Sequence, residues 1–156
     1  MFRIRTFARF VLLVALASGC GKTLKPGQKP TYSVRGQVLV NDQPATNARV
    51  ILVPLSGTPD ERRPSAFCLS DGTFELSTYE SRDGAPEGEY TVLIEWRPAL
   101  PENPREQGPD RLGGKYADLK TAALKVTVKK EPNALEPFRL SLPKTAGLPA
   151  RSSDRG

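Results

Sequence analysis

The chain contains no histidine, and among its 156 residues it has only two cysteines, one tryptophan and one methionine. Without histidine, Ser–His–Asp triads and Cys–His pairs are impossible, and so are the usual zinc clusters. No phosphate-binding loop occurs either, because Gly113-Gly114 has neither the spacing nor the following Lys-Ser/Thr of a Walker motif. We therefore predict a protein that is not an enzyme and that binds no cofactor or metal.

A helical repeat is also absent after the first twenty residues, and 15 prolines and 13 glycines divide the chain into short segments. The repeat that does occur has a period of two, because apolar and polar side chains alternate as they do on a strand with one buried face. We expect strands over residues 32–40, 47–55, 65–70, 74–77, 90–97, 122–130 and 134–142, of which 47–55 is apolar on both faces, as a central strand would be. About seven short strands favour an all-β fold, an Ig-like sandwich of two sheets.

The clearest alternation lies within residues 71–96. Phe74 lies on the apolar face of its first half, and the apolar face of its second half consists of Tyr90, Val92, Ile94 and Trp96. The dipeptides Asp71-Gly72 and Asp83-Gly84 are turn signals, since glycine reaches positive φ without steric cost. The pattern predicts a hairpin in which Trp96 belongs to the core.

Charge of one sign is not concentrated anywhere along the chain. The formal net charge is +6, but half of it comes from Arg3, Arg5 and Arg9, and without them 20 Lys and Arg residues face 17 Asp and Glu residues. No run of basic residues is longer than two, and aromatic residues are not interleaved with them. Surfaces that bind nucleic acid usually cluster their basic residues, so we predict no nucleic-acid partner.

The N-terminus carries the longest apolar segment. The three arginines precede an apolar stretch, Phe10–Ala17, which is too short to span a bilayer because spanning takes about 20 residues. Small residues then lead directly to Cys20. This pattern predicts a secretory signal peptide over residues 1–19 rather than a transmembrane helix.

The small residues followed by Cys20 resemble the bacterial lipobox, the cleavage and lipidation site of bacterial lipoproteins. The resemblance implies cleavage before Cys20, acylation of that residue (palmitate included) and membrane attachment in the cell envelope. No aspartate follows Cys20, so the same family rule implies the outer membrane, on its periplasmic or surface face. Each buried CH₂ of an acyl chain contributes about 0.8 kcal/mol of membrane affinity. The alternative is an ordinary signal peptide cut near Ala17 or Gly19, which leaves Cys20 as a free or paired thiol.

The remainder divides into a tether, one domain and a tail. Residues 20–31 consist of Cys20 and a Pro-, Gly-, Lys- and Gln-containing segment, and we expect a flexible tether because it has almost nothing to bury. The sandwich domain covers residues 32–142, and the polar residues 143–156 are expected to be a disordered tail. Residues 97–111 contain four prolines and predict a long loop that is functional or disordered.

The second cysteine, Cys68, lies in the short apolar run Ala66–Leu69. We predict that Cys68 is buried and unreactive, since no cationic partner is evident nearby. Acids such as Asp71 and Asp83 sit in turn contexts, and we predict that they shape turns rather than perform acid–base chemistry or bind calcium.

Three segments in order carry a further resemblance: VRGQV with NDQP (residues 34–44), DGTF (71–74) and GEYTV (88–92). Together with DGAP (83–86) and LGGKY (112–116), they resemble the carboxypeptidase-regulatory-like (transthyretin-like, prealbumin-like) β-sandwich of bacterial surface lipoproteins. The resemblance covers about residues 32–142 and implies a seven-stranded Greek-key sandwich, non-catalytic in most members and used for accessory, adhesion or carbohydrate-facing roles. The hydroxyisourate hydrolase of this fold uses histidines, which this chain lacks.

The candidate ligand-contacting residues are Tyr116, Trp96 and Tyr79, because exposed aromatic side chains are suited to surface recognition. Tyr116 is the best placed, in a glycine-rich charged segment. We expect a non-catalytic, membrane-anchored binding or structural module whose partner is an envelope protein or a glycan. The alternatives are a carbohydrate-binding module of the cell surface and, with the least support, a hydrolase that uses loop carboxylates.

Overall fold

The computed structural model describes residues 24–58, 61–100, 103 and 105–142, and none of these residues lies in a helix. The strands are β1 (Thr31–Tyr32), β2 (Val34–Val40), β3 (Gln43–Pro44), β4 (Arg49–Pro54), β5 (Ser65–Phe67), β6 (Thr73–Glu75), β7 (Ala85–Pro86), β8 (Gly88–Glu95), β9 (Lys125–Val128), β10 (Asn133–Ala134) and β11 (Phe138–Leu140). The all-β prediction is confirmed, and each predicted strand has a counterpart. Strands of two residues, such as β3 and β7, cannot be predicted from alternation, because two residues are too few to show a period.

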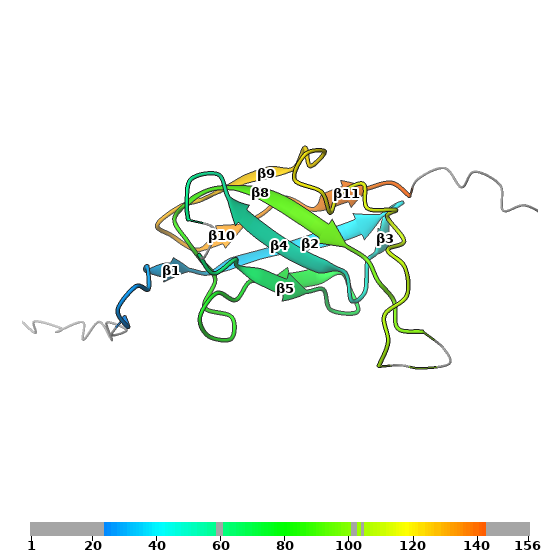
Figure 1. Ribbon diagram of the computed structural model, residues 1–156, viewed down its shortest axis with the longest axis horizontal. Coiled ribbons are helices and arrows are strands. Elements are labelled where there is room, and N and C mark those ends of the chain that lie inside the picture. The colour runs from blue at the N-terminus through cyan, green and yellow to red at the C-terminus, as the bar shows by residue number, and fades with distance from the viewer. Residues whose placement is uncertain (1–23, 59–60, 101–102, 104, 143–156) are drawn as a thin grey trace, which may run out of the picture.

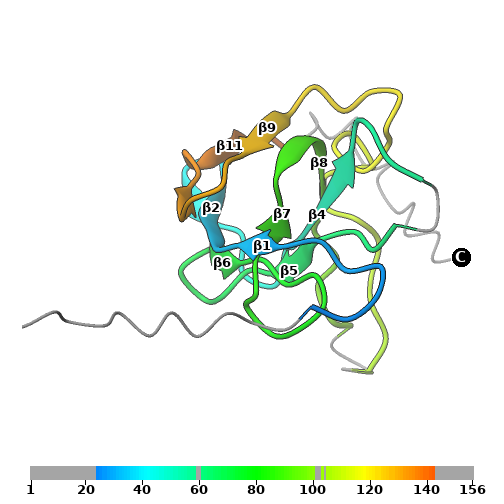
Figure 2. The ribbon, with the colours of Figure 1, turned by 90° about the vertical axis from the view of Figure 1, so that its left-hand side faces the viewer.

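Two layers of strands face each other, as Figures 1 and 2 show from the front and from one end. In one layer β2 is central, with β3 and β6 antiparallel on one side and β10 and β11 parallel on the other. The other layer has the antiparallel order β5-β4-β8-β9. The short strands β1 and β7 pair at one end. The result is a sandwich-like arrangement, and its Greek-key classification stays a prediction.

The core lies between the layers, where alternate side chains of β2, β4 and β8 meet. The fully buried side chains include Val34, Val38, Val50, Leu52, Val92 and Ile94. Phe74 from β6 stacks on Phe138 from β11 with ring centroids 6.2 Å apart. Burying one such side chain stabilises the fold by about 1.5–3 kcal/mol, so the alternation seen in the sequence corresponds to the main source of stability.

The predicted hairpin within residues 71–96 is wrong, because its two halves belong to different layers. β6 pairs with β2, where Phe74 lies opposite Gly36, whereas β8 lies between β4 and β9. The side chains of β8 are buried on both faces from Tyr90 to Ile94, and its two edges are occupied by β4 and β9, so no edge is left for β6. The turn at Gly72 instead joins β5 to β6, with the Leu69 amide donating to the Thr73 carbonyl at 2.7 Å.

The N- and C-terminal ends of the described chain leave the sandwich at opposite ends of its long axis (Figure 1). Residues 24–31, the described part of the expected tether, contact the domain. The Lys29 amide donates to the Tyr79 hydroxyl at 3.2 Å, and the Lys29 ammonium forms an ion pair with Glu61 at 2.6 Å. The expected signal peptide, Cys20 and the expected tail (143–156) lie outside the described residues. No helix in the described part of the chain is long and apolar enough to cross a membrane.

Candidate binding groove

A groove of about 510 Å³ lies at the junction of the two layers, where β5 and β6 meet. We call it the β5–β6 groove; it is lined by Arg35, Gly36, Gln37, Phe67, Leu69, Thr73, Phe74, Glu75, Arg82, Ala134 and Leu135. Two of its large apolar side chains face solvent, since Phe67 is 55% exposed and Leu69 is 59% exposed. Their neighbour Cys68 is buried, as the alternation along an extended chain requires.

The bottom of the groove depends on a glycine. A Cβ atom at Gly36 would lie 2.6 Å from Cζ of Phe74, closer than two carbon atoms can approach. Because Gly36 has no side chain, the Phe74 ring lies across β2 and packs on Phe138. The Phe74 ring is buried beneath the groove, and its contacts with Gly36 and Phe138 fix its position.

The charged side chains around the groove are arginines and glutamates. Arg82 forms an ion pair with Glu75 at 3.4 Å, and the Arg49 guanidinium lies 5.9 Å from the centroid of the Phe67 ring. Phe67 also lines an adjoining hollow with Asn47, Arg49, Glu95, Arg97 and Gln107. Across the groove and this hollow, four arginines face two glutamates, and no lysine takes part. The surface around Phe67 thus combines exposed apolar area with an excess of positive charge.

Cys68 lies beneath this surface and is 2% exposed, which confirms its predicted burial. Burial, with a smaller contribution from the charge of Asp71, raises the pKa of the Cys68 thiol from 9.0 to about 12. The thiolate is the reactive form of cysteine, so a raised pKa makes the thiol inert near neutral pH. The position therefore supports packing rather than nucleophilic chemistry.

We expect Cys68 in the folded chain to react with iodoacetamide at pH 8 at least about a hundred times more slowly than in urea-unfolded chain, because both burial and the raised pKa suppress the thiolate. Because unfolding lowers the pKa of the thiol from about 12 to 9.0, the folded state loses stability relative to the unfolded chain as pH rises from 9 towards 12. Mass spectrometry of the peptide that contains Cys68 measures the rate. Equal rates in folded and unfolded chains would contradict the burial.

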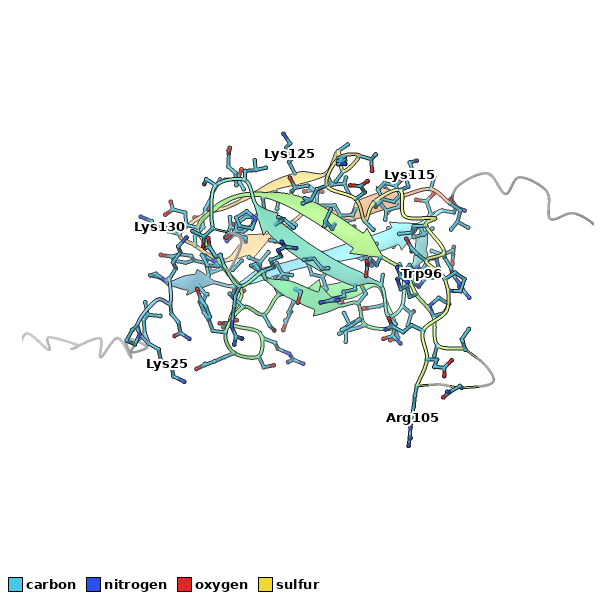
Figure 3. All side chains as sticks on the ribbon, in the orientation of Figure 1. Lys25, Trp96, Arg105, Lys115, Lys125 and Lys130 are labelled. Carbon is cyan, nitrogen blue, oxygen red and sulfur yellow. The ribbon has the colours of Figure 1, made fainter. Side chains whose placement is uncertain are left out.

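The structure places Tyr79 far from the other two candidate aromatic residues. Tyr79 is partly buried near β1, and its hydroxyl accepts the Lys29 amide. It lines a separate hollow of about 690 Å³ formed by residues 25–29, 57–58, 61–62 and 79. Trp96 follows β8 and lies at the opposite end of the domain from Lys25, which lines the same hollow as Tyr79 (Figure 3). The Tyr116 carbonyl accepts the Ile94 amide at 2.9 Å, so Tyr116 lies near the end of β8 that Trp96 follows, and the three predicted residues do not form one site.

Trp96 is partly buried at the rim of the core, so its predicted place inside the core is correct only in part. Its indole Nε1 donates to the Thr46 carbonyl at 2.9 Å, and the Arg111 guanidinium lies 5.0 Å from its ring centroid. One hydrogen-bonding group and one ring face are therefore occupied within the chain. A ligand-contacting role for Trp96 stays a prediction.

Tyr116 packs against the core, and its hydroxyl accepts the Ser141 amide at 3.4 Å. The Lys115 ammonium lies 5.1 Å from the centroid of its ring. The segment that carries it is ordered by Leu112, which is fully buried, and by Asp110, whose carboxylate accepts the amides of Trp96, Leu112 and Gly114. Tyr116 is thus held on both sides, and its role as a ligand contact stays a prediction.

The turn acids have the structural role that the sequence predicts. The Asp71 carboxylate accepts both the hydroxyl and the amide of Thr73, and these hydrogen bonds lower the pKa of Asp71. The Asp83 carboxylate accepts the amides of Thr78, Tyr79 and Glu80. Among the described residues, no group of three or more His, Cys, Asp or Glu side chains is placed to bind a metal ion.

No protein-family model and no curated protein sequence matches the chain. A DUF3823 family protein from Parabacteroides merdae is similar in structure, with a TM-score of 0.38 and 17% identity over 74% of this chain and 47% of that protein. A 9R-lipoxygenase from Cyanothece has a TM-score of 0.37 and 17% identity over 83% of this chain and 20% of that enzyme. This chain spans less than half the length of each. At these TM-scores, neither similarity bears on its function.

Proposed function

We propose that the chain is a non-catalytic, lipid-anchored binding module of the cell envelope, with acylated Cys20 as its anchor and the β5–β6 groove as its binding surface. The observation that carries this proposal is the groove itself, where Phe67 and Leu69 expose apolar area on a domain with a well-buried core. Large apolar side chains that form a contiguous exposed patch mark protein–protein or membrane interaction sites or ligand-binding grooves. The seven-stranded Greek-key fold of carboxypeptidase-regulatory-like lipoproteins belongs to the same proposal.

The lipid anchor is supported by the sequence around Cys20 and by the described N-terminal segment. Residue 24 lies four positions after Cys20, and Lys29 is held to the sandwich by Tyr79 and Glu61. An anchor at Cys20 would hold that end of the domain against the membrane. The absence of a catalytic role is supported by the lack of histidine and by the raised pKa of Cys68.

We expect Cys20→Ser to move the protein from the membrane pellet to the supernatant and to abolish incorporation of radiolabelled palmitate. Two attached acyl chains bind a membrane stably, whereas none remains in this variant. Cell fractionation and fluorography measure the two effects. The matched control is Cys68→Ala, which should stay acylated and in the pellet.

The lipid anchor would be contradicted if the unaltered protein begins at Cys20 and the Cys20→Ser variant carries no label but still stays in the membrane pellet. Unchanged palmitate labelling in Cys20→Ser would contradict the assignment to this residue. The carbohydrate-binding alternative predicts that the anchored chain is retained on envelope polysaccharide and that this retention is lost in the Tyr116→Ala variant.

A further inference from the structure

We propose that the β5–β6 groove binds an acidic segment of a partner protein that carries apolar side chains. This inference rests on the proposed function, because it names the kind of partner that the binding surface would take. Three features of the molecule support it: the apolar side chains of the groove, the charges around them and the kind of basic residue that lines it.

The apolar part of the groove fits protein side chains better than sugars. Phe67, Leu69 and Leu135 supply one aromatic and two aliphatic side chains, and Phe74 is buried beneath them. The one exposed ring, Phe67, has the Arg49 guanidinium over it, and the two aliphatic side chains offer no ring face on which a sugar could stack. Aliphatic side chains pack well against the apolar side chains of a peptide. The shape and chemistry of the groove therefore favour a protein segment over a glycan.

The charges around the groove select an acidic occupant. Glu75 is paired with Arg82, and Glu95 lies 4.0 Å from Arg97. Arg35 and Arg49 lie opposite Glu75 and Glu95 in the strand register but form no ion pair within 4.0 Å among the described residues, so the surface keeps two more arginines than glutamates. Arg35 and Arg49 are exposed, and Arg49 stands over the Phe67 ring, next to the apolar side chains. Guanidinium groups bind carboxylates through two parallel hydrogen bonds, so these arginines suit Asp or Glu side chains.

The basic residues that line the groove and the adjoining hollow are all arginines, and the lysines of the described residues lie elsewhere. Lys125 lies on β9 and Lys130 follows it, so both lie at the edge of the layer β5-β4-β8-β9 that is opposite β5. Lys115 lies on the same upper side of the domain in Figure 3. Lysine on an edge strand discourages pairing with another chain. Around the groove every basic residue is arginine, and arginine and aromatic residues are enriched in protein interfaces whereas lysine is depleted. A second copy of the chain is a poor occupant, because two surfaces with an excess of positive charge repel each other.

The test uses the full chain, purified from membranes and reconstituted in phosphatidylcholine vesicles. A phage-displayed library of random twelve-residue peptides is selected on these vesicles and on empty ones. We expect the selected peptides to be enriched in Asp and Glu near Leu, Ile or Phe. Synthetic versions should bind more weakly as salt increases, because charge pairs at an open groove are screened. A selected set without acidic enrichment would overturn the proposal.

Paired variants locate the site. Phe67→Ser with Leu69→Ser, and separately Arg35→Glu with Arg49→Glu, should each weaken peptide binding at least about tenfold, the size of effect that marks an energetic anchor. Leu119→Ser and Lys125→Glu are matched controls on other exposed residues and should leave binding unchanged. Because the groove residues are exposed, circular dichroism should show that all variants fold. Binding that survives the groove variants would overturn the proposal.

Two further measurements separate the competing occupants. If heparin binds the vesicles, if this binding is lost in Arg35→Glu, and if no peptide binds, the groove would be assigned to an anionic glycan and the protein partner would be overturned. Cross-linked dimers that vanish in Phe67→Ser would assign it to a second copy. All groove variants should remain in the membrane pellet. Failure of peptide binding with normal anchoring therefore overturns this inference alone, whereas an unlipidated Cys20 overturns the anchor and leaves the groove result standing.

Discussion

Gly84→Ala should lower the free energy of unfolding by about 3–5 kcal/mol, combining backbone strain with a clash that cannot relax. Gly84 has a φ of 86°, and a Cβ atom there would lie 1.8 Å from the Tyr32 carbonyl oxygen. The obstructing atoms belong to the backbone of Tyr32 in β1 and of Ser33 after it, so a side-chain rotation cannot relieve the contact. Urea unfolding followed by circular dichroism measures the change.

Gly114→Ala is the matched control for that experiment. Gly114 also has a positive φ, of 74°, but a Cβ atom there would meet nothing within 4 Å. Its loss should be limited to about 1–2 kcal/mol, the cost of a left-handed conformation for an L-residue. The difference between the two variants isolates the steric part. Equal losses would mean that the approach of Gly84 to Tyr32 has no energetic weight.

Phe74→Ala should also cost about 3–5 kcal/mol of unfolding free energy, the usual range for deleting a buried aromatic ring. Phe74 is 1% exposed, stacks on Phe138 and lies across Gly36. Its removal leaves a cavity between β2, β6 and β11 and takes away the packing beneath the β5–β6 groove. Chemical denaturation measures the loss.

The same substitution at Phe67 provides the comparison, since Phe67 is 55% exposed. We expect Phe67→Ala to change the free energy of unfolding by no more than about 0.5 kcal/mol, as for most exposed positions. A loss as large as that of Phe74→Ala would show that Phe67 contributes to the core and would remove the main apolar element of the proposed binding surface.

The sequence predicts where strands lie but not which strands pair. The alternation at Phe74 and at Tyr90 shows which side chains share a face, and both sets are indeed buried. It carries no information about the neighbour across a sheet, which here depends on distant residues such as Gly36 opposite Phe74. Turn dipeptides are equally ambiguous, because Asp83-Gly84 fits a chain that crosses between layers as well as one that closes a hairpin.

The groove could not be predicted from the sequence, for a related reason. Ala66 to Leu69 are four consecutive apolar residues, and such a run normally indicates burial of the whole segment. In the structure Cys68 points into the core while Phe67 and Leu69 point out, and nothing local marks the outward pair as unusual. The best available signal was the alternation of an extended chain, which requires every second side chain of residues 66–69 to face away from the core.

The parallel pairing of β2 with β11 has a mechanical consequence. β2 lies near the N-terminal end of the described chain and β11 near its C-terminal end, and Val38, Leu39 and Val40 pair with Phe138, Arg139 and Leu140. The chain ends leave at opposite ends of the long axis (Figure 1). Tension between an N-terminal anchor and a load at the C-terminal end would pull these strands past each other lengthwise. All the hydrogen bonds between them would then resist together, instead of opening one after another.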